Sequence, residues 1–412
     1  MGLKVVLGVG GGIAAYKACQ VVRDFTEAGD DVRVVPTPAA LNFVGSATFE
    51  ALSGHPVSTT VFDAVDEVQH VRIGQEADLV VVAPATADLL ARLAAGRADD
   101  LLTASVLVAT CPVVIVPAMH TEMWKNPAVR RNVELLREFG YVVMEPAHGR
   151  LTGADSGPGR LPDPAQIADF ARSVARGHRP PRSLAGRRVL ITAGGTQENI
   201  DPVRYIGNRS SGRQGFALGE VAAQAGARVT MVVGDTDALS TPAGAEVVRV
   251  RSTRQMHAAV QERAAASDLI IMAAAVADFR PLNEADSKLK KGSADDALRH
   301  VDLVENPDIL RDLVDWRRAG VVPAGTIIVG FAAETEQPGA SVRELARKKL
   351  QRKGCDFLMC NDVSGGAVFG QDRNSGWLLA ADGRETVIAD GSKLDVAMEI
   401  LTHVAGERIL ND

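Results

Sequence analysis

Three glycines in the first half of the chain are placed where a phosphate could be bound. Gly10, Gly11 and Gly12 come directly after the apolar run 4–9, and a stretch of helical character begins at Ile13. A strand that delivers glycines into a helix makes backbone N–H groups available to a phosphate at the helix N-terminus. A tight turn that serves only the fold would use the same glycines, so this motif alone leaves both interpretations open.

The next apolar runs restrict the kind of phosphate ligand. NAD-binding folds place an acidic residue about twenty positions after the glycines, at the end of the second strand. This chain has no Asp or Glu there, because the strand end is Val-Val-Pro-Thr and finishes at Thr37. The hydroxyl of Thr37, together with Pro84-Ala85-Thr86 after the later run 79–83, favours a cofactor with a single phosphate.

Two histidines of the first half lie beside expected strands. His70 follows an acidic stretch within the sequence Val-Gln-His-Val. A lone histidine is more often structural or simply exposed than catalytic. His120 lies in PAMHTEMW, residues 117–124, which follows an apolar run where α/β proteins place ligands. The methionines and tryptophan of this run could equally belong to the core.

The second half has its own polar run before a helix. Residues 201–212 are rich in polar and turn-forming types and end in Ser210, Ser211 and Gly212. Hydroxyl and backbone donors at a helix start can bind an anion, and the same groups can also cap the helix. Further along, three alanines and Val-Ala precede Asp278. Small residues let a flat base or a phosphate approach the backbone, and Asp278 could bind a metal or a ribose.

Positive charge is concentrated between residues 287 and 292, where the sequence is Ser-Lys-Leu-Lys-Lys-Gly. A solvated loop would explain these lysines, but lysine also binds polyphosphate as a compact point charge. Additional candidates lie at 306–309, at 330–334 and in the basic helix 346–353. Acidic and basic groups near strand ends are what a Mg²⁺–triphosphate site requires.

Valine-rich runs alternate with helical stretches, which predicts βαβ units and parallel sheets in an α/β fold. Aromatic residues make up only 4% of the sequence, and this also favours aliphatic parallel sheets. We expect strands at 4–9, 32–35, 79–83, 113–116, 188–192, 229–233, 269–275, 327–331 and 357–360, and a hairpin at 377–389. Helices are expected at 13–28, near 127, at 164–176, after 212, at 346–353 and at 392–407.

A length of 412 residues is too great for one ordinary domain. The Gly- and Pro-rich stretch 148–164 predicts a loop or flap, and GHRPPRSLAGRR, residues 177–188, has the prolines of a linker. We therefore expect a first domain at 1–178, a linker at 179–187 and a second domain at 188–412. Both domains are predicted to be Rossmann-like, because each contains the same strand–glycine–helix arrangement.

Composition excludes several classes of protein. The net charge of −6 gives no general attraction to nucleic acid or to anionic membranes. The four cysteines form no close metal-binding pair, which favours a reducing cytoplasm. The N-terminus enters a strand directly, so we expect neither a signal peptide nor a membrane span.

Together, the motifs of the first half resemble the flavin-dependent cysteine decarboxylase family, specifically phosphopantothenoylcysteine decarboxylase. The resemblance rests on GVGGGIAAYK, the His70 segment, Pro84-Ala85-Thr86-Ala87, PAMHTEMW and the loop ending Gly157-Pro158-Gly159-Arg160. It implies a flavodoxin-like domain in which FMN oxidises the cysteinyl thiol end of 4′-phosphopantothenoylcysteine. The thioaldehyde so formed loses CO₂, and return of the electrons gives 4′-phosphopantetheine. His70 is the implied active-site base, and the implied FMN contacts are Gly11, Gly12, Ile13, Thr37, Pro84, Ala85, Thr86 and Met119.

Three positions depart from the pattern of that family. His120 stands where the family usually has an asparagine that holds the substrate carboxylate, and Asp88 also replaces an asparagine. The flap has Gly153 where the family has a proton-donating cysteine. Glycine has no side-chain proton to donate, so another group, such as His120, Asp155 or water, would have to serve. An active ligase fused to an inactive flavin-binding domain is the alternative interpretation.

Residues 187–405 resemble phosphopantothenate–cysteine ligase, in the order of the fused bacterial enzyme of coenzyme A biosynthesis. The resemblance implies that CTP converts the carboxylate of 4′-phosphopantothenate into an acyl-cytidylate and that cysteine then displaces CMP. Asn208 is the implied support of the acyl-cytidylate, Lys288 contacts the nucleotide, and Asp278 is the ligand for Mg²⁺. In the ligase half the other implied substrate contacts are Ser210, Ser211, Gly212, Met272, Ala273, Ala274, Asp278, Pro307, Asp308, Ile309, Leu310, Phe331, Lys349 and Lys353, and in the decarboxylase half the implied substrate contact is His120.

The same resemblance implies a homo-oligomer. In the family the flavin half assembles as trimers with its site at subunit contacts, and the ligase half dimerises. A dodecamer would satisfy both symmetries. Two further interpretations of the residues stay open, a tandem NAD-type oxidoreductase and a regulatory nucleotide-binding module. The first would bind nicotinamide and lack a yellow colour, and the second needs no reactive asparagine or lysine cluster.

Overall fold

The computed structural model describes residues 2–61, 68–150, 156–290, 300–334, 341–362 and 372–406. Contacts divide the chain into two compact units, Met1–Arg179 and Pro180–Asp412. Each unit alternates strands with helices around a mainly parallel sheet, which confirms the predicted α/β fold class.

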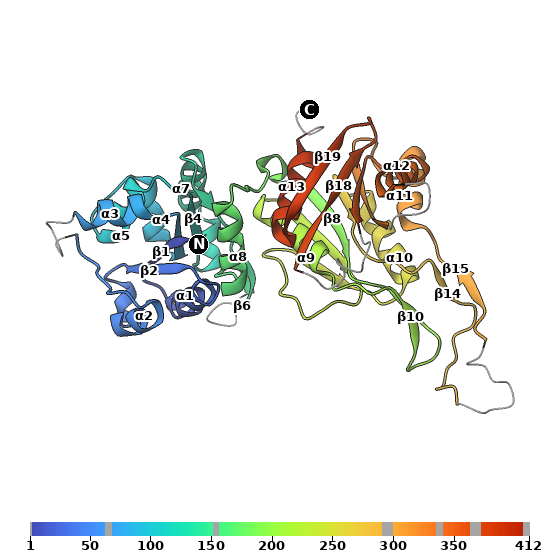
Figure 1. The fold of residues 1–412 in the computed structure, drawn as a ribbon, viewed down its shortest axis with the longest axis horizontal. Helices are drawn as coiled ribbons and strands as arrows, with labels where there is room; N and C mark the ends of the chain where they lie inside the picture. Colours follow the sequence, from blue (N-terminus) through green and yellow to red (C-terminus); the bar gives the residue numbers. More distant parts are fainter. Residues whose placement is uncertain are drawn as a thin grey trace. The chain divides into compact units, whose positions relative to one another are not determined.

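The first unit is built on a five-stranded parallel sheet in the order β2-β1-β3-β4-β5 (Figure 1). Its strands are β1 (Lys4–Val9), β2 (Asp31–Pro36), β3 (Leu79–Ala85), β4 (Val113–Pro117) and β5 (Val142–Val143). Its helices are η1 (Ile13–Lys17), α1 (Ala18–Thr26), η2 (Ala40–Asn42), α2 (Ser46–Ser53), α3 (Gln69–Glu76), α4 (Ala87–Ala94), α5 (Leu101–Val108), α6 (Thr121–Lys125), α7 (Pro127–Glu138) and α8 (Pro164–Ala175).

Helices cover both faces of this sheet, so its central strands read as continuous apolar runs. Every residue of β3 is buried. One face carries a core cluster in which residues of α4, α5 and α7 pack on β1, β3 and β4. Helices α1 and α8 pack together, and α8 contacts β3 and β4. The resulting scaffold holds the ends of its strands rigidly in place.

The order of the strands brings the glycine turn beside a second loop. The chain runs from β1 to β2 on one side and later returns to β3 on the other side of β1. Gly10 N donates to Pro84 O at 2.9 Å, so the loops after β1 and β3 are in contact. Open α/β sheets bind ligands at such a reversal of strand order.

A short hairpin, β6 (Ala147–Arg150) and β7 (Ser156–Arg160), occupies the predicted flap region. Met119 N donates to Gly159 O at 2.9 Å, which joins the hairpin to the loop after β4. A Cβ atom at Gly159 would lie 2.2 Å from Met119 O, so this approach requires glycine. Gly153 and Asp155, which bear on the predicted proton donor, lie outside the described residues.

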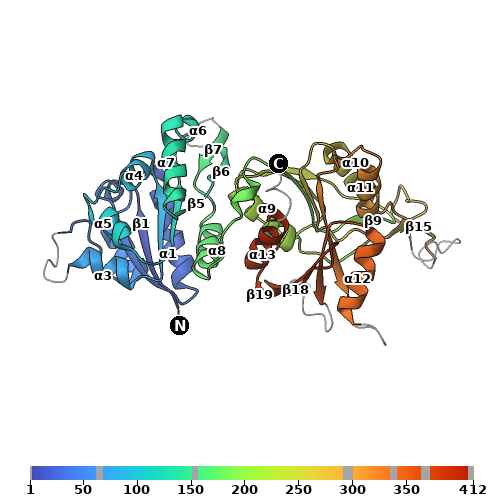
Figure 2. The same ribbon diagram turned by 90° about the horizontal axis from the view of Figure 1, so that it is seen from above.

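The second unit contains an eight-stranded sheet in the order β12-β11-β8-β13-β16-β17-β18-β19. Figure 2 shows its last two strands, β18 and β19, beside α13. Its strands are β8 (Arg188–Ala193), β11 (Arg228–Val233), β12 (Glu246–Arg249), β13 (Leu269–Met272), β16 (Ile327–Glu334), β17 (Phe357–Asp362), β18 (Arg373–Ala380) and β19 (Glu385–Ser392). The last two run antiparallel and form the predicted hairpin, whereas the others are parallel. The helices are η4 (Arg182–Leu184), α9 (Arg213–Gln224), α10 (Thr253–Ala264), α11 (Ile309–Arg318), α12 (Val342–Lys353) and α13 (Lys393–Ala405).

Two layers of helices also enclose this second sheet. Buried residues of α10, α11 and α12 pack against alternate residues of the central strands in one core cluster. Helices α9 and α13 pack on each other, α9 against β8 and α13 against β18 and β19. Two small pairs, β9 (Gln197–Asn199) with β10 (Tyr205–Gly207) and β14 (Phe279–Pro281) with β15 (Leu303–Glu305), extend from loops after strands.

The structure differs from the sequence prediction at the end of one strand and at the start of one helix. The strand expected at 269–275 stops at Met272, because the backbone beyond it leaves the regular ladder. Ala274 N donates to Thr192 Oγ1 at 3.2 Å and Ala275 N to Gly194 O at 2.8 Å. The helix expected from Ile13 begins with the 3-10 turn η1 before α1.

All four cysteines are free. Burial raises the pKa of the Cys19 and Cys111 thiols, and it raises the pKa of Cys355 to about 11. In the part of the chain that the structure describes, no helix is long and apolar enough to cross a membrane.

Candidate functional site

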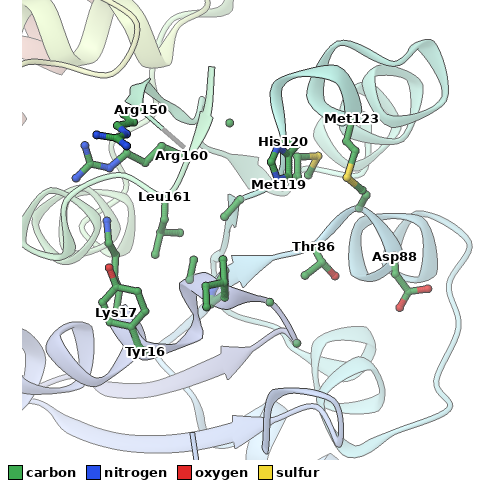
Figure 3. A pocket seen from close by; sticks show the side chains of 18 residues that line it. Tyr16, Lys17, Thr86, Asp88, Met119, His120, Met123, Arg150, Arg160 and Leu161 are labelled. Carbon is green, nitrogen blue, oxygen red and sulfur yellow. The ribbon is translucent and has the colours of Figure 1, made fainter. Parts of the chain in front are cut away.

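A cavity of about 550 Å³ lies at the reversal of strand order in the first unit. Residues from the loops after β1, β3 and β4 and from the hairpin β6–β7 surround it (Figure 3). Its lining comprises Gly11, Gly12, Ile13, Ala14, Tyr16, Lys17, Pro84, Thr86, Ala87, Asp88, Ala118, Met119, His120, Met123, Arg150, Gly159, Arg160 and Leu161.

The glycine turn forms one wall of this cavity. A Cβ atom at Gly11 would lie 2.4 Å from Ala39 Cβ and 2.8 Å from the Ala39 carbonyl carbon, so no side chain fits there. Gly12 is the N-cap of η1 and no side chain caps this helix. Thr86 caps α4 by accepting from Leu89 N at 3.3 Å. The N–H groups that begin η1 have no side-chain cap and are placed to meet an anion, whereas Gly10 N and Gly12 N donate to Pro84 O and Gly10 O.

The remaining walls of the cavity differ in the type of side chain that they carry. Figure 3 shows Met119, His120 and Met123 on one side of the cavity and Lys17, Arg150 and Arg160 on the other. Burial, helped by Arg160, lowers the pKa of the Lys17 ammonium, and Asp163 opposes this change. A cation with a lowered pKa gains from an anionic neighbour. The cavity thus combines an apolar side with a cationic side.

Three predicted residues of the first unit do not line the cavity. Thr37 is only 5% exposed and accepts from Ala40 N at 3.3 Å, and Ala85 is fully buried in β3. His70 lies on α3, which packs against α5. Its Nδ1 is buried and has no hydrogen-bond partner among the described residues. An orphaned ring nitrogen of this kind needs a partner from elsewhere.

A smaller cavity, of about 180 Å³, lies at the strand ends of the second unit. It is lined by Arg209, Ser210, Ser211, Gly212, Arg213, Gln214, Gly215, Ala273, Ala274, Ala275, Phe331, Ala332, Ala333, Asn361, Asn374 and Lys393. No side chain caps α9, and its N-cap Gly212 has φ +73°. A Cβ atom at Gly215 would lie 2.5 Å from Ala193 Cβ, so glycine lets α9 approach β8 closely.

Other predicted ligase residues form a cluster beside β14. Asn306 N donates to Asp278 O at 2.8 Å, and Asp278 is exposed. Asp308 caps α11 by accepting from Arg311 N at 3.2 Å and forms an ion pair with Lys353. Pro307 and Leu310 are half-buried, as is Lys349 on α12, whereas Ile309 and Met272 are buried.

The predicted catalytic residues of the second unit lie on exposed loops. Asn208 Nδ2 donates to Val276 O at 2.9 Å, so it contacts the loop after β13. Lys288 is exposed and precedes Leu289, whose N–H donates to Asp201 Oδ2 at 3.2 Å. Burial by itself would raise the pKa of Asp201, but hydrogen bonds from backbone N–H groups outweigh it and lower that pKa.

Comparison with known proteins assigns both units. The family described as "Flavoprotein" matches residues 1–176, and the family "DNA/pantothenate metabolism flavoprotein C-terminal domain" matches 184–407. The coenzyme A biosynthesis bifunctional protein CoaBC of Mycolicibacterium smegmatis is 56% identical over 403 residues, which cover 98% of this chain and 97% of that protein. The chain belongs to this bifunctional family.

A CoaBC protein of Bacillus subtilis is 42% identical over 406 residues, covering 97% of this chain and 96% of that protein. Among solved structures, a C-terminal domain of CoaBC is 34% identical and covers 55% of this chain and 97% of its own, with a TM-score of 0.44. A PPC decarboxylase mutant complexed with pantothenoylaminoethenethiol is 29% identical and covers 43% of this chain and 100% of its own, with a TM-score of 0.38.

Membership of the CoaBC family confirms the function predicted from the motifs. The protein is a bifunctional enzyme of coenzyme A biosynthesis, with a phosphopantothenoylcysteine decarboxylase half and a phosphopantothenate–cysteine ligase half. The match over both halves supports this interpretation over a ligase fused to an inactive flavin-binding domain.

Several residues that line the two cavities are not among the candidate residues predicted from the sequence. Tyr16 and Lys17 close the run GVGGGIAAYK, whose length could have pointed to them. Arg150 is the last residue of β6, and no motif indicated it. In the second unit, Asn374 and Lys393 come from β18 and α13, far along the chain from the Ser-Ser-Gly motif. Only the folded sheet brings them to it.

Proposed function

We propose that the first unit binds FMN in the 550 Å³ cavity and converts 4′-phosphopantothenoylcysteine into 4′-phosphopantetheine and CO₂. The second unit, in this proposal, uses CTP to join 4′-phosphopantothenate to cysteine, releasing CMP and pyrophosphate. The single observation that carries the proposal is that each unit has a cavity at its strand ends, lined by the residues of its own motifs.

The first cavity fits a flat flavin with one phosphate. Its glycine turn has no room for a Cβ atom at Gly11, and the N–H groups that begin η1 have no side-chain cap. Ile13 and Met123, 61% and 46% exposed, provide apolar surface for a ring. We propose that Gly11, Gly12, Ile13, Pro84, Thr86 and Met119 hold the cofactor directly and that Thr37 and Ala85 support this wall from behind. When bound, FMN supplies the two-electron oxidation and reduction that the decarboxylation needs.

His70 is proposed as the base that removes a proton from the substrate. Because it does not line the cavity of its own unit, we propose that it acts at a contact between subunits of a homo-oligomer. Its buried, unpartnered Nδ1 agrees with a partner supplied from outside the described chain. His120 begins α6 and forms no side-chain cap there, so its imidazole is available to the substrate carboxylate.

In the ligase unit, we propose that the α9 N-terminus and Ser210-Ser211-Gly212 bind the nucleotide phosphates, with Ala273, Ala274 and Phe331 beside them. Asn208 would support the acyl-cytidylate, and Lys288 would neutralise charge that develops on the phosphates. The cluster of Met272, Asp278, Pro307, Asp308, Ile309, Leu310, Lys349 and Lys353 would frame the rest of the nucleotide.

We propose that Mg²⁺ binds together with the phosphates of the nucleotide. Within the described residues, no group of three or more His, Cys, Asp or Glu side chains could hold a metal ion. Mg²⁺ commonly takes only one or two protein carboxylates and is otherwise held by phosphates and water. Asp278 is the carboxylate we propose for it. Assembly as a dodecamer and a cytoplasmic location also remain proposals.

A product analysis tests the proposed function. The purified enzyme is incubated with 4′-phosphopantothenate, cysteine, Mg²⁺ and either CTP or ATP, and the products are identified by mass. We expect 4′-phosphopantetheine, CMP and pyrophosphate from the CTP reaction. Amide formation with ATP alone, or amide formation without CMP, would contradict the proposed activation.

A further inference from the structure

Lys393 is a lysine of the ligase cavity that none of the sequence motifs included. It is the first residue of α13, and it lines the cavity together with the first turn of α9. Its side chain is half-buried. A lysine in such a place loses hydration, so its charge must be stabilised by what occupies the cavity.

A chain of hydrogen bonds sets the position of Lys393 relative to α9. Gln214 Nε2, on the first turn of α9, donates to Lys393 O at 3.1 Å. Asn374 Nδ2, on β18, donates to Gln214 Oε1 at 3.0 Å. Lys393 N donates to Asp372 O at 3.1 Å. Helix α9 and the residue before β18 thus hold the Lys393 backbone, and Asn374 fixes the Gln214 side chain that makes one of these bonds.

The charged groups near Lys393 do not neutralise its ammonium. Burial lowers its pKa to about 8, while Asp372 raises this pKa and Arg213 lowers it. The Asp372 carboxylate forms an ion pair with Arg213, which also pairs with Asp237. Arg209 adds a further cation to the lining of the cavity. The carboxylate nearest in effect is thus shared with Arg213, and an anion in the cavity would further stabilise the Lys393 ammonium.

Two further features point to a polar ligand. The α9 helix has 12 residues and no side-chain cap, so N–H groups of its first turn remain available to an anion. Asn374 is only 3% exposed, yet its Oδ1 has no hydrogen-bond partner within the described residues. A buried, unpartnered amide oxygen is costly unless a ligand or its bound water donates to it.

We propose that Lys393 binds the β- and γ-phosphates of the nucleotide, the part that leaves as pyrophosphate. This proposal rests on the ligase function proposed above and adds a residue to it. Asn208, the proposed support of the reacting α-phosphate, is held by Val276 and is not among the residues that line this cavity. Lys393 enters the cavity from α13, so it contacts the phosphates beyond the reacting one.

Binding measurements with three ligands test this assignment. Titration calorimetry with Mg²⁺ present gives the affinity of the full-length enzyme for CTP, pyrophosphate and CMP, in wild type and in Lys393→Met. We expect CTP and pyrophosphate to bind the variant about tenfold or more weakly, the usual scale for a lost charged hydrogen bond. CMP should bind both proteins equally. Lys348→Met, which removes an exposed lysine of α12 outside the cavity lining, is the control and should match wild type.

The pH dependence separates a phosphate contact from a structural role. Phosphate favours the protonated ammonium, so wild-type pyrophosphate affinity should be complete below pH 8 and fall above it. Lys393→Arg keeps its charge at every accessible pH and should bind pyrophosphate without this fall. Lys393→Met should be weak throughout, so its difference from wild type should shrink as the pH rises.

Each outcome decides for or against the assignment. Equal pyrophosphate binding by wild type and Lys393→Met would overturn it, as would an equal loss of CMP binding. If the wild-type enzyme bound pyrophosphate through Lys393 but never formed CMP, the proposed reaction would be wrong and the proposed phosphate contact would stand. Normal CMP formation with unchanged CTP and pyrophosphate binding in the variant would refute the contact alone.

Discussion

Asp201 organises two loops of the ligase unit from a fully buried carboxylate. It accepts from the backbone N–H groups of Val203, Arg204 and Leu289 and forms an ion pair with Arg204 at 2.7 Å. Lys288 immediately precedes one of these donors. A carboxylate that receives several backbone donors holds its loops in one arrangement. The placement of Lys288 therefore depends on Asp201.

The lowered pKa of Asp201 predicts a pH-dependent contribution to stability. A carboxylate whose pKa is lowered by folding stabilises the protein above its unfolded pKa of about 4, and this contribution is lost as the pH falls through the folded value. Asp201→Asn should therefore be less stable than wild type at pH 7, with a difference that shrinks in acid. Denaturant unfolding between pH 3 and pH 7 measures it, and a pH-independent difference would contradict the mechanism.

His70 offers a second test at the level of single residues. His70→Asn should abolish CO₂ release from 4′-phosphopantothenoylcysteine, because asparagine cannot accept the substrate proton at neutral pH. Amide formation by the ligase unit should continue at the wild-type rate. The exposed pair His55–Asp31, outside the cavity lining, supplies the control His55→Asn, which should keep both activities. Equal loss of both activities in a folded His70→Asn protein would show that the two sites are not independent.

At the level of elements, the loop after β1 has no room for a side chain at Gly11. Gly11→Ala would place a methyl group against Ala39, and overpacking of this kind costs about 1–3 kcal/mol. The turn should shift and flavin should be lost, which visible absorbance of the purified protein detects. Gly45 has nothing within 4 Å of its Cβ position, so Gly45→Ala should stay yellow. Full flavin content in Gly11→Ala would remove this turn from the proposed cofactor site.

Strands were predictable wherever they are buried and aliphatic. The run 4–9 became β1 without change, because a valine-rich segment covered on both faces has few alternatives. The pairs β9–β10 and β14–β15 were not predicted, since strands of three residues are too short to show a hydrophobic period and depend on tertiary contacts. The strand end at Met272 was missed because Thr192 and Gly194, distant in sequence, bind the backbone beyond it.

Candidate site residues were predictable where they cluster in motifs, and lone residues were not. The glycine turn and the loop at 117–124 both line the first cavity, as expected from strand ends that converge. Lys393 carried no signal, because a single lysine at a helix start is common on protein surfaces. It follows β19 directly, and only the folding of the hairpin β18–β19 against the sheet brings it to the cavity.

For the whole molecule, the division into two units predicts that each variant can be rescued by the other. His70→Asn protein should stop at 4′-phosphopantothenoylcysteine, and Asn208→Asp protein should bind CTP but form no amide. Mixing the two should restore 4′-phosphopantetheine, because each mixture contains one intact copy of each unit and the intermediate can diffuse. The products of the mixture, and of each variant alone as a control, are identified by mass. Absence of 4′-phosphopantetheine from the mixture would contradict the proposal of separate sites.

The burial of its cysteines has a consequence for an enzyme that works with thiols. Attack on a disulfide requires a thiolate, and the raised pKa of Cys19, Cys111 and Cys355 keeps these sulfurs protonated at neutral pH. Free cystine in the cell should therefore form mixed disulfides with this protein only slowly. The chain can therefore handle a sulfhydryl substrate while these three thiols stay unreactive.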